Sequence, residues 1–308
     1  MQIPFQFLAP KTNLRPGLAC EITSEGVIAA HQVDGQEATM AFTPIAAGIV
    51  RPGLAEANFA DQPLVVAALR KALDEVAGRE KQLTLVIPDA AVRVLVMDFD
   101  TLPAKVQEAL PIVRFRLKKL APFEVEDAAV SYQVMRQTSE QTRVLATVMP
   151  AAIRAEYESA VIAAGYEPGV ILPSTLAALA ALAADGASLV INHNGHSLTT
   201  AITQGNELLL HRTLELPASD EWHHEELART VSVAMAYFED TLQTRPNVLN
   251  YVGPGGAQEF TRVMGEAPGQ MLEEYGLRVR DLVPALAAGG STGLPKGLVA
   301  GVVGALAS

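Results

Sequence analysis

The sequence predicts an α/β protein made of two copies of one domain, with a smaller block inserted into the first copy. The main observation is a repeated unit of apolar strand, short polar turn and returning strand. It reads LACEITSEGVIAAHQV from Leu18 and SLVINHNGHSLTTAI from Ser188. Such a unit at the head of two halves is typical of a duplicated domain. The two turns could hold one ligand between them, and turns of this kind usually hold a nucleotide phosphate.

Composition limits the class of protein. The chain has 308 residues, of which 49% are hydrophobic, and this is enough for two buried cores. Its net charge of −11 would repel the phosphates of DNA or RNA, so we expect no nucleic-acid partner.

The single cysteine and the lack of an expected signal peptide or membrane span indicate the cellular compartment. Cys20 lies in an apolar strand and is the single cysteine, which indicates core filling in a reducing compartment. The N-terminal stretch MQIPFQFLAPKTNLRPG has too short an apolar run for a signal peptide. The late apolar stretch over residues 297–307 is shorter than the roughly 20 residues of a membrane span. We therefore expect a cytoplasmic protein.

A helix follows the first hairpin, in the segment AEANFADQPLVVAALRKALDEVAG. Apolar residues recur there at helical spacing, and Gly78 marks the end of the helix. The apolar set is Leu64, Ala68, Leu69, Leu73 and Val76.

Residues 84–166 have a strand and helix order of their own. Two strands surround Pro88 and Asp89, and a helix over about residues 104–120 follows, with Pro111 as a kink. A hairpin then turns near residues 138–141, and a last helix over residues 151–164 stops at Gly165. We therefore assign residues 1–83 and 167–186 to the first domain and residues 84–166 to an inserted small subdomain.

The second half begins after an Ala-rich helix that is expected to end at Asp185 and Gly186. The second hairpin, a strand over residues 208–214, a helix over residues 224–242 and a strand over residues 248–252 follow in order. A helix up to Gly265, a short strand near residues 277–279 and a terminal helix complete the chain. These elements make residues 187–308 the second domain.

Three turns carry the candidate binding residues: the turn of each hairpin, and a Gly-rich turn between a strand and a helix. Backbone N–H groups of such turns, and hydroxyls beside them, can bind phosphate. The candidates are Glu21, Thr23 and Ser24 in the first hairpin, Asn192, Asn194, Gly195 and Ser197 in the second, and Gly253, Gly255 and Gly256 in the Gly-rich turn.

The chemistry of these turns argues against hydrolysis. An acid beside each turn would order a magnesium ion and its waters, but Asn192 is neutral and can act neither as a base nor as a counter-charge. Neither hairpin turn contains lysine or arginine, so a triphosphate would lack positive compensation. The turns are either a residual nucleotide site or ordinary hairpin connections in a fold that has lost its ligand. The glycines of the third turn are either ligand contacts or steric necessities.

Other polar residues have a simpler interpretation. His193 and His196, like the adjacent pair at positions 223 and 224, lack the further ligands of a metal site, so we expect surface histidines and no bound metal. Asp98 and Asp100 share one strand face, as an acid and base pair would, but solvated strand-end charges are the expected interpretation.

One basic cluster lies on the helix of the inserted block. It consists of Arg114, Arg116, Lys118 and Lys119. A solvated helix face would explain it, and so would contact with acidic partners or lipid headgroups.

The stretches LVIPDAAVRVLVMDFDTLP, KKLAPFEVEDAAVSYQV and AALAADGASLVI, in this order, resemble the PilM proteins of type IV pilus assembly. These are related to GspL of type II secretion and to FtsA. The likeness extends over nearly the whole chain from Leu18, and its most specific part is the element order of hairpin, inserted block, second hairpin, helix and Gly-rich turn. It implies an actin-like fold of duplicated ribonuclease H-like domains, with the inserted small subdomain of the FtsA and PilM type.

The resemblance also implies roles for single residues. Glu21 and Thr23 stand where the family has Asp and Gly in its first phosphate loop, and Asn192 and Asn194 stand at the corresponding places of the second. Leu216 and Pro217 fall where a Gly-Gly pair is expected. Gly255 and Gly256 match the glycines on the adenosine side.

PilM-like proteins typically bind ATP, and they recruit the cytoplasmic N-terminal peptide of a PilN-like inner-membrane protein beside the small subdomain. The sequence therefore predicts an actin-like adaptor of a type IV pilus or type II secretion platform. This adaptor would be a pseudo-ATPase that works by protein contacts, with no required cofactor and at most weak ATP binding. It would reach the inner membrane as a peripheral protein only through its partners, and it could be an oligomer.

Two alternatives stay open. The first is an active Mg-ATP-binding ATPase or a sugar-kinase-like phosphotransferase in which Glu21 organises the metal. The second is a filament-forming cytoskeletal protein of the same fold.

Overall fold

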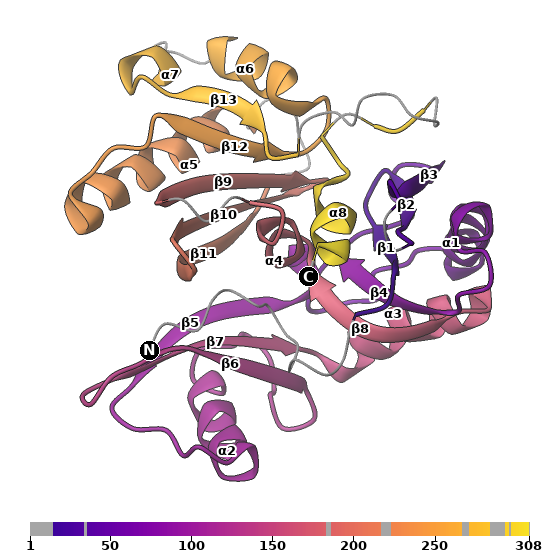
Figure 1. Cartoon of the computed structure of the whole chain (residues 1–308), viewed down its shortest axis with the longest axis horizontal. Coiled ribbons are helices and arrows are strands. Elements are labelled where there is room, and N and C mark those ends of the chain that lie inside the picture. The colour runs from indigo at the N-terminus through magenta and orange to yellow at the C-terminus, as the bar shows by residue number, and fades with distance from the viewer. Residues whose placement is uncertain are drawn as a thin grey trace.

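Two five-stranded sheets of matching topology form the centres of two lobes, and a three-stranded sheet forms a small subdomain beside them (Figure 1). The computed structural model describes residues 15–33, 36–182, 186–216, 223–266, 271–283, 293–295 and 297–307. The N-terminal stretch up to residue 14, Asp185 and Pro217 lie outside the described residues, as do the side chains at positions 223 and 224.

The first sheet has the order β3-β2-β1-β4-β8. Its strands are β1 (Leu18–Ile22), β2 (Gly26–His31), β3 (Thr39–Pro44), β4 (Gln82–Ile87) and β8 (Glu167–Pro173). The first three strands are antiparallel neighbours, whereas β4 runs parallel to β1 and β8 runs parallel to β4. Every residue of β1 is buried, as expected for a central strand covered on both faces.

The second sheet repeats this plan with the order β11-β10-β9-β12-β13. Its strands are β9 (Ala187–Asn194), β10 (Ser197–Gln204), β11 (Glu207–Glu215), β12 (Val248–Val252) and β13 (Arg278–Asp281). The hairpin partners are again antiparallel, and β12 and β13 again join as parallel strands. The duplication that the two hairpins predict is therefore present at the level of sheet topology.

Two helices lie together on one side of the first sheet: α1 (Gln62–Val76) and α3 (Ala151–Ala164) (Figure 1). The Asp61 side chain accepts a hydrogen bond from the Leu64 N–H and so caps the start of α1. Ala68, Leu69 and Leu73 of the predicted apolar face are buried, but Leu64 is 51% exposed and Val65 is buried in its place. At the other helix, Gly165 adopts a left-handed conformation with φ of 93° and ends α3 as predicted.

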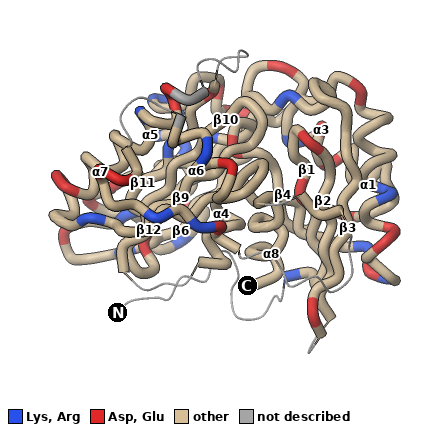
Figure 2. Tube along the Cα trace, turned by 90° about the horizontal axis from the view of Figure 1, so that it is seen from above, with Lys and Arg blue, Asp and Glu red and all other residues tan. Residues whose placement is uncertain are grey.

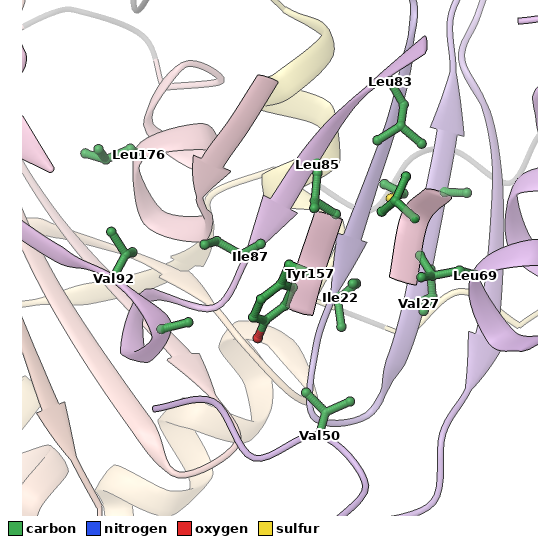
Figure 3. Packing of buried hydrophobic residues seen from close by; sticks show 14 of the residues in the cluster. Ile22, Val27, Val50, Leu69, Leu83, Leu85, Ile87, Val92, Tyr157 and Leu176 are labelled. Atoms are coloured by element: carbon green, nitrogen blue, oxygen red, sulfur yellow. The ribbon is translucent and has the colours of Figure 1, made fainter. Parts of the chain in front are cut away.

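The core of the first lobe fills the space between these helices and the sheet. Figure 3 shows Ile22, Val27 and Leu85 of the strands beside Leu69 of α1 and Tyr157 of α3. Tyr157 is fully buried, and its hydroxyl donates a hydrogen bond to Asn58 Oδ1 at 3.1 Å. The polar end of this side chain is thereby satisfied inside an apolar core.

The small subdomain is narrower than residues 84–166. It contains β5 (Arg93–Phe99), β6 (Ala129–Gln137) and β7 (Thr142–Met149) in the order β5-β7-β6, together with α2 (Val106–Leu117). The predicted boundaries included β4 and α3, but β4 is hydrogen-bonded to β1 and α3 packs on α1. Both elements therefore belong to the first lobe, because the chain leaves that lobe only after β4 and returns before α3.

The remaining helices are α4 (Ser174–Leu179), α5 (His223–Tyr237), α6 (Gly256–Glu266), α7 (Met271–Glu274) and α8 (Ala300–Leu306), and a π-helical turn, η3 (Phe238–Leu242), extends α5. The assignment of residues 187–308 to the second domain needs one correction. The terminal helix α8 packs against α4, β1 and β2 of the first lobe (Figure 1).

No described helix is long and apolar enough to cross a membrane.

A network of charged side chains joins the small subdomain to the second lobe. Arg143 on β7 pairs with Asp98 on β5, with Nε to Oδ1 at 2.8 Å, and with Glu207 on β11, with Nη1 to Oε1 at 3.0 Å. Arg136 on β6 also reaches Glu207, at 3.7 Å. Asp98 is thus an ion-pair partner and not a solvated strand-end charge, whereas Asp100 is exposed as expected.

Replacing Glu207 with glutamine is expected to loosen this connection. The side chains of Glu207 and Arg143 are only 20% and 23% exposed, so their pairing is less screened than that of a surface pair. We expect a loss of about 1 kcal/mol in the free energy of unfolding, measured by urea titration. Glu140→Gln in the exposed turn between β6 and β7 is the control and should change little. Equal effects of the two changes would contradict a specific role for Glu207.

Candidate functional site

The ends of β1 and β9 place Glu21 and Asn192 at the seam between the two lobes, where both are 2% exposed. One hydroxyl connects them. Ser174, at the start of α4, donates from Oγ to Glu21 Oε1 at 2.6 Å and lies 3.0 Å from Asn192 Nδ2, which donates to it. The two positions singled out from the hairpins therefore meet in the folded chain, within one hydrogen-bonded group.

Four members of this group were not predicted from the sequence: Asp89, Ser174, Thr175 and His211. Thr175 donates to Asp89 Oδ2 at 2.5 Å, and Asn192 Nδ2 lies 3.4 Å from the same oxygen. The Nε2 atom of His211 is buried without a hydrogen-bond partner, 3.8 Å from Asp89 Oδ1. Pro88 and Asp89 directly follow β4, and Ser174 and Thr175 directly follow Pro173, the last residue of β8. Because β4 and β8 are parallel neighbours, these residues lie at the same edge of the sheet. This shared edge was the sequence signal that could have indicated Asp89, Ser174 and Thr175.

Burial controls the charge of Glu21. Its side chain lies against α8, where a Cβ on Gly301 would be 2.7 Å from Glu21 Cδ, and its Oε2 has no hydrogen-bond partner. Desolvation raises the pKa of Glu21 to about 8, and the charge of nearby Asp89 adds to this effect, while the hydrogen bond from Ser174 opposes it. At neutral pH the carboxyl is therefore mostly protonated as long as no cation lies beside it.

The two hairpin turns touch each other. Gly195 has φ of 58°, and a Cβ placed on it would overlap the Ser24 hydroxyl and lie 2.8 Å from Ser24 Cβ. The Ser24 N–H also points to Asn194 Oδ1, at 3.4 Å. The space between the turns is thus closed by the turns themselves.

Hydroxyls of both turns are used inside their own hairpins. Thr23 Oγ1 donates to the Gly26 carbonyl at 3.0 Å and accepts from the N–H groups of Glu25 and Gly26. Ser197 donates to the Asn194 carbonyl at 3.0 Å. These hydroxyls stabilise the turns, so donating either hydroxyl hydrogen to a phosphate would require breaking a bond within that hairpin.

The Gly-rich turn lies against the second hairpin, since a Cβ on Gly253 would be 3.0 Å from His193 Cβ. The segment before α8 covers this turn. Gly253 donates its N–H to the Gly297 carbonyl at 2.9 Å, and a Cβ on Gly297 would lie 2.8 Å from Gly256 Cα. At the start of α6 the Ala257 N–H is bonded to Asp281 Oδ1 at 2.7 Å, so a carboxylate of the chain already occupies this helix terminus.

Three features of this seam bear on whether it could hold a magnesium-bound triphosphate. A triphosphate needs a gap between the hairpin turns, ionised acids for the metal and positive charge for the phosphates. Here Ser24 lies against Gly195, burial raises the pKa of Glu21 to about 8, and Asn192 is neutral. Of the ten predicted residues, Glu21 and Asn192 meet through Ser174, and Ser24 meets Asn194 and Gly195.

The predicted surface histidines are placed differently from each other. His196 is exposed, whereas His193 is half-buried, with Nδ1 3.3 Å from the Tyr251 hydroxyl and Nε2 3.1 Å from the Gly195 carbonyl. Within the described part of the chain, no three His, Cys, Asp or Glu side chains are arranged to hold a metal ion.

A hollow of about 520 Å³ lies away from the seam, between α5 and the strands β10 and β11, and Leu210 and Val233 are among its lining residues.

Comparison with solved structures identifies the architecture. A chain of the PilM–PilN type IV pilus biogenesis complex superposes with a TM-score of 0.66 and 19% identity, over 85% of this chain and 90% of that one. A protein of unknown function from Bacteroides thetaiotaomicron, described as having an actin-like ATPase fold, superposes with a TM-score of 0.51 and 10% identity, over 85% and 88% of the two chains. The chain has the actin-like fold. The ethanolamine utilization protein EutJ from Carboxydothermus hydrogenoformans matches this actin-like chain with a TM-score of 0.52 and 10% identity, over 99% and 93% of the chains.

These matches confirm the actin-like fold that the resemblance to PilM predicts. No protein-family model matches the sequence, and no curated protein matches it. In an actin-like fold the hairpin turns of the two lobes face one another across the seam, and here they are Thr23–Gly26 and Asn194–Ser197. The likeness is one of architecture, so the function has to be argued from the seam and the surfaces of this chain.

Proposed function

We propose that this protein is a cytoplasmic actin-like adaptor of a type IV pilus or type II secretion platform at the inner membrane. In this proposal it works by contacts with other proteins, and its nucleotide cleft is degenerate. The observation that supports it most is the contact of Ser24 with Gly195, which closes the place where an actin-like protein would hold phosphates. The likeness to a chain of the PilM–PilN complex supports the choice of machine.

The interface between the lobes is built for stability in one arrangement. Ser174 and Thr175 join Glu21, Asp89 and Asn192 through buried hydrogen bonds, which are costly to break without replacement. An adaptor needs such a fixed body, because a rigid surface loses little entropy when it binds a partner. A nucleotide-driven enzyme would have to open and close this seam in each cycle.

The partner in this proposal is the N-terminal cytoplasmic segment of a PilN-like membrane protein, bound where the small subdomain meets the lobes. Half-buried apolar side chains support this place. Val96 on β5 and Met135 on β6 pack against the core of the lobes and not beneath α2. Met135 lies at a bulge between Val134 and Arg136, where β6 loses register with β7. Bulges often redirect side chains toward binding sites.

Titration calorimetry with a synthetic N-terminal peptide of the neighbouring membrane protein tests the adaptor role. We expect binding by the unchanged chain and roughly tenfold weaker binding by Met135→Asp, because a charge replaces a partly buried apolar contact. Leu64→Asp, on the exposed side of α1, is the matched control and should bind as the unchanged chain does. Absence of binding at high micromolar peptide would reject the adaptor proposal.

The degenerate cleft has a separate test. Calorimetry with ATP and magnesium should give no binding isotherm, because the closed turns and the protonated Glu21 leave the metal and phosphates without ligands. Magnesium-dependent binding would contradict the degenerate cleft and would favour an active ATPase or a phosphotransferase. The peptide experiment and the ATP experiment can fail independently, so each part of the proposal is tested alone.

A further inference from the structure

Helix α2 carries an exposed face that its own subdomain does not need. Ile112, Phe115, Arg116, Lys119 and Leu120 recur at positions i, i+3, i+4, i+7 and i+8, so they share one side of the helix and of the turn that continues it. Ile112, Phe115 and Leu120 are 40%, 64% and 50% exposed. We call these five residues the α2 face.

The opposite side of the helix holds the subdomain together. Ala109, Val113 and Leu117 are fully buried against the three-stranded sheet. The α2 face therefore points away from this core, and α2 lies on the outer side of the small subdomain, away from the second lobe (Figure 1). Three large apolar side chains grouped on one exposed side of a helix are unusual unless something covers them.

The charges of the α2 face indicate what could cover it. Arg116 and Lys119 are its only ionisable residues, and Lys119 Nζ lies 4.8 Å from the centre of the Phe115 ring. Of the acids nearby, Glu108 pairs with Lys105 at 3.3 Å and Glu126 pairs with Lys118, while Glu124 and Asp127 are exposed in the segment that follows the α2 face. Arg114 is also occupied, because its guanidinium donates to the carbonyls of Val125, Glu126 and Ala128. The α2 face is therefore cationic and apolar at once.

We propose that the α2 face lies on an anionic lipid surface. Phe115, Ile112 and Leu120 would enter the boundary between headgroups and acyl chains, while Arg116 and Lys119 would contact lipid phosphates. A convex helix with an apolar stripe flanked by cations matches a flat anionic surface better than it matches a peptide, which would require a groove.

The acidic character of the whole chain does not oppose this contact. Acidic residues are spread over both lobes (Figure 2), and the net charge is −11. At physiological salt, however, exposed charges act over a Debye length of about 8 Å, so only residues close to the lipid matter. The contact would add to the membrane attachment through partners that the sequence predicts, and it does not depend on the peptide proposal.

Vesicle flotation at physiological salt tests this proposal with the full chain alone. The probes are phosphatidylcholine vesicles with and without about one third phosphatidylglycerol. We expect the unchanged chain to float with the anionic vesicles only. The double variant Phe115→Ser with Lys119→Glu should partition roughly 30-fold less, because it removes an apolar anchor and reverses one charge.

The chain offers a matched control on α1. Leu64 is 51% exposed and Lys71 is exposed seven positions later, so Leu64→Ser with Lys71→Glu also removes an exposed apolar side chain and reverses one charge, on another helix. This control should float as the unchanged chain does, and circular dichroism should show native helix content in both variants. The proposal is overturned if the unchanged chain does not float, if it floats equally with neutral vesicles, or if both double variants lose binding equally. It is also overturned if the α2 face binds an acidic peptide or a second copy of the chain but no vesicles.

Discussion

Replacing Gly304 with alanine is expected to lower the free energy of unfolding by about 2–4 kcal/mol. Gly304 lies on the side of α8 that faces α4. A Cβ at this position would overlap the carbonyl oxygen of Ala177 and lie 2.8 Å from its carbonyl carbon. Because both obstacles are backbone atoms, no side-chain rotation can relieve the overlap, and α8 would have to shift away from α4. Urea titration followed by circular dichroism measures the loss.

Gly265 supplies the control for this prediction. It lies in α6, and a Cβ on it would meet nothing within 4 Å. Gly265→Ala should therefore stabilise the protein by up to about 1 kcal/mol, through the helix propensity of alanine. If Gly304→Ala proved as harmless as Gly265→Ala, α8 would not be packed tightly on the first lobe.

The position of α8 matters for the seam as well as for stability. The helix holds Gly301 against Glu21, and the segment before it holds Gly297 against the Gly-rich turn. The end of the chain therefore contacts both the hairpin strand of the first lobe and the Gly-rich turn of the second. This contact, together with that of Ser24 and Gly195, fixes the lobes relative to each other.

Local patterns were sufficient to predict the elements of this fold. The strand over residues 248–252 and the helix over residues 151–164 have the predicted bounds, because Gly165 and the Gly-rich turn after Val252 stop them. Each hairpin could be read from an apolar run, a polar turn and a second run. The meeting of Glu21 and Asn192 also followed from the repeat, since equivalent positions of a duplicated domain lie in equivalent places.

Long-range packing was not predictable in the same way. Nothing in the sequence of α8 shows that it returns to the first lobe, since its Ala and Gly residues are compatible with any close-packed neighbour. The alternative in which Glu21 organises a metal ion was stated without knowledge of its burial. Ser174, Asp89 and Gly301 surround it from three distant parts of the chain, and together they decide its protonation.

Because Glu21 is protonated in the folded chain, we expect the free energy of unfolding to fall as pH rises. The pKa of Glu21 is about 8 in the folded chain, against 4.5 as the ordinary value. Between these values the native state holds a proton that the unfolded state has lost, so raising the pH favours unfolding. Below about pH 4.5 both states are protonated and above about pH 8 both are ionised, so the slope from this group is confined to the interval between them.

Glu21→Gln should remove this slope, because an amide keeps the shape of the protonated carboxyl, can accept the hydrogen bond from Ser174 and does not titrate. Between about pH 6 and pH 8 the unchanged protein should lose about 2 kcal/mol relative to Glu21→Gln. Urea titrations at the two pH values measure the difference, and Glu37→Gln, at an exposed position, should behave as the unchanged chain does. Equal slopes in the unchanged protein and in Glu21→Gln would mean that the pKa of Glu21 is not raised by folding and that its carboxyl is ionised at neutral pH. The carboxylate would then be available to a metal ion, and the argument that the seam is a packed interface and not a nucleotide site would lose its electrostatic support.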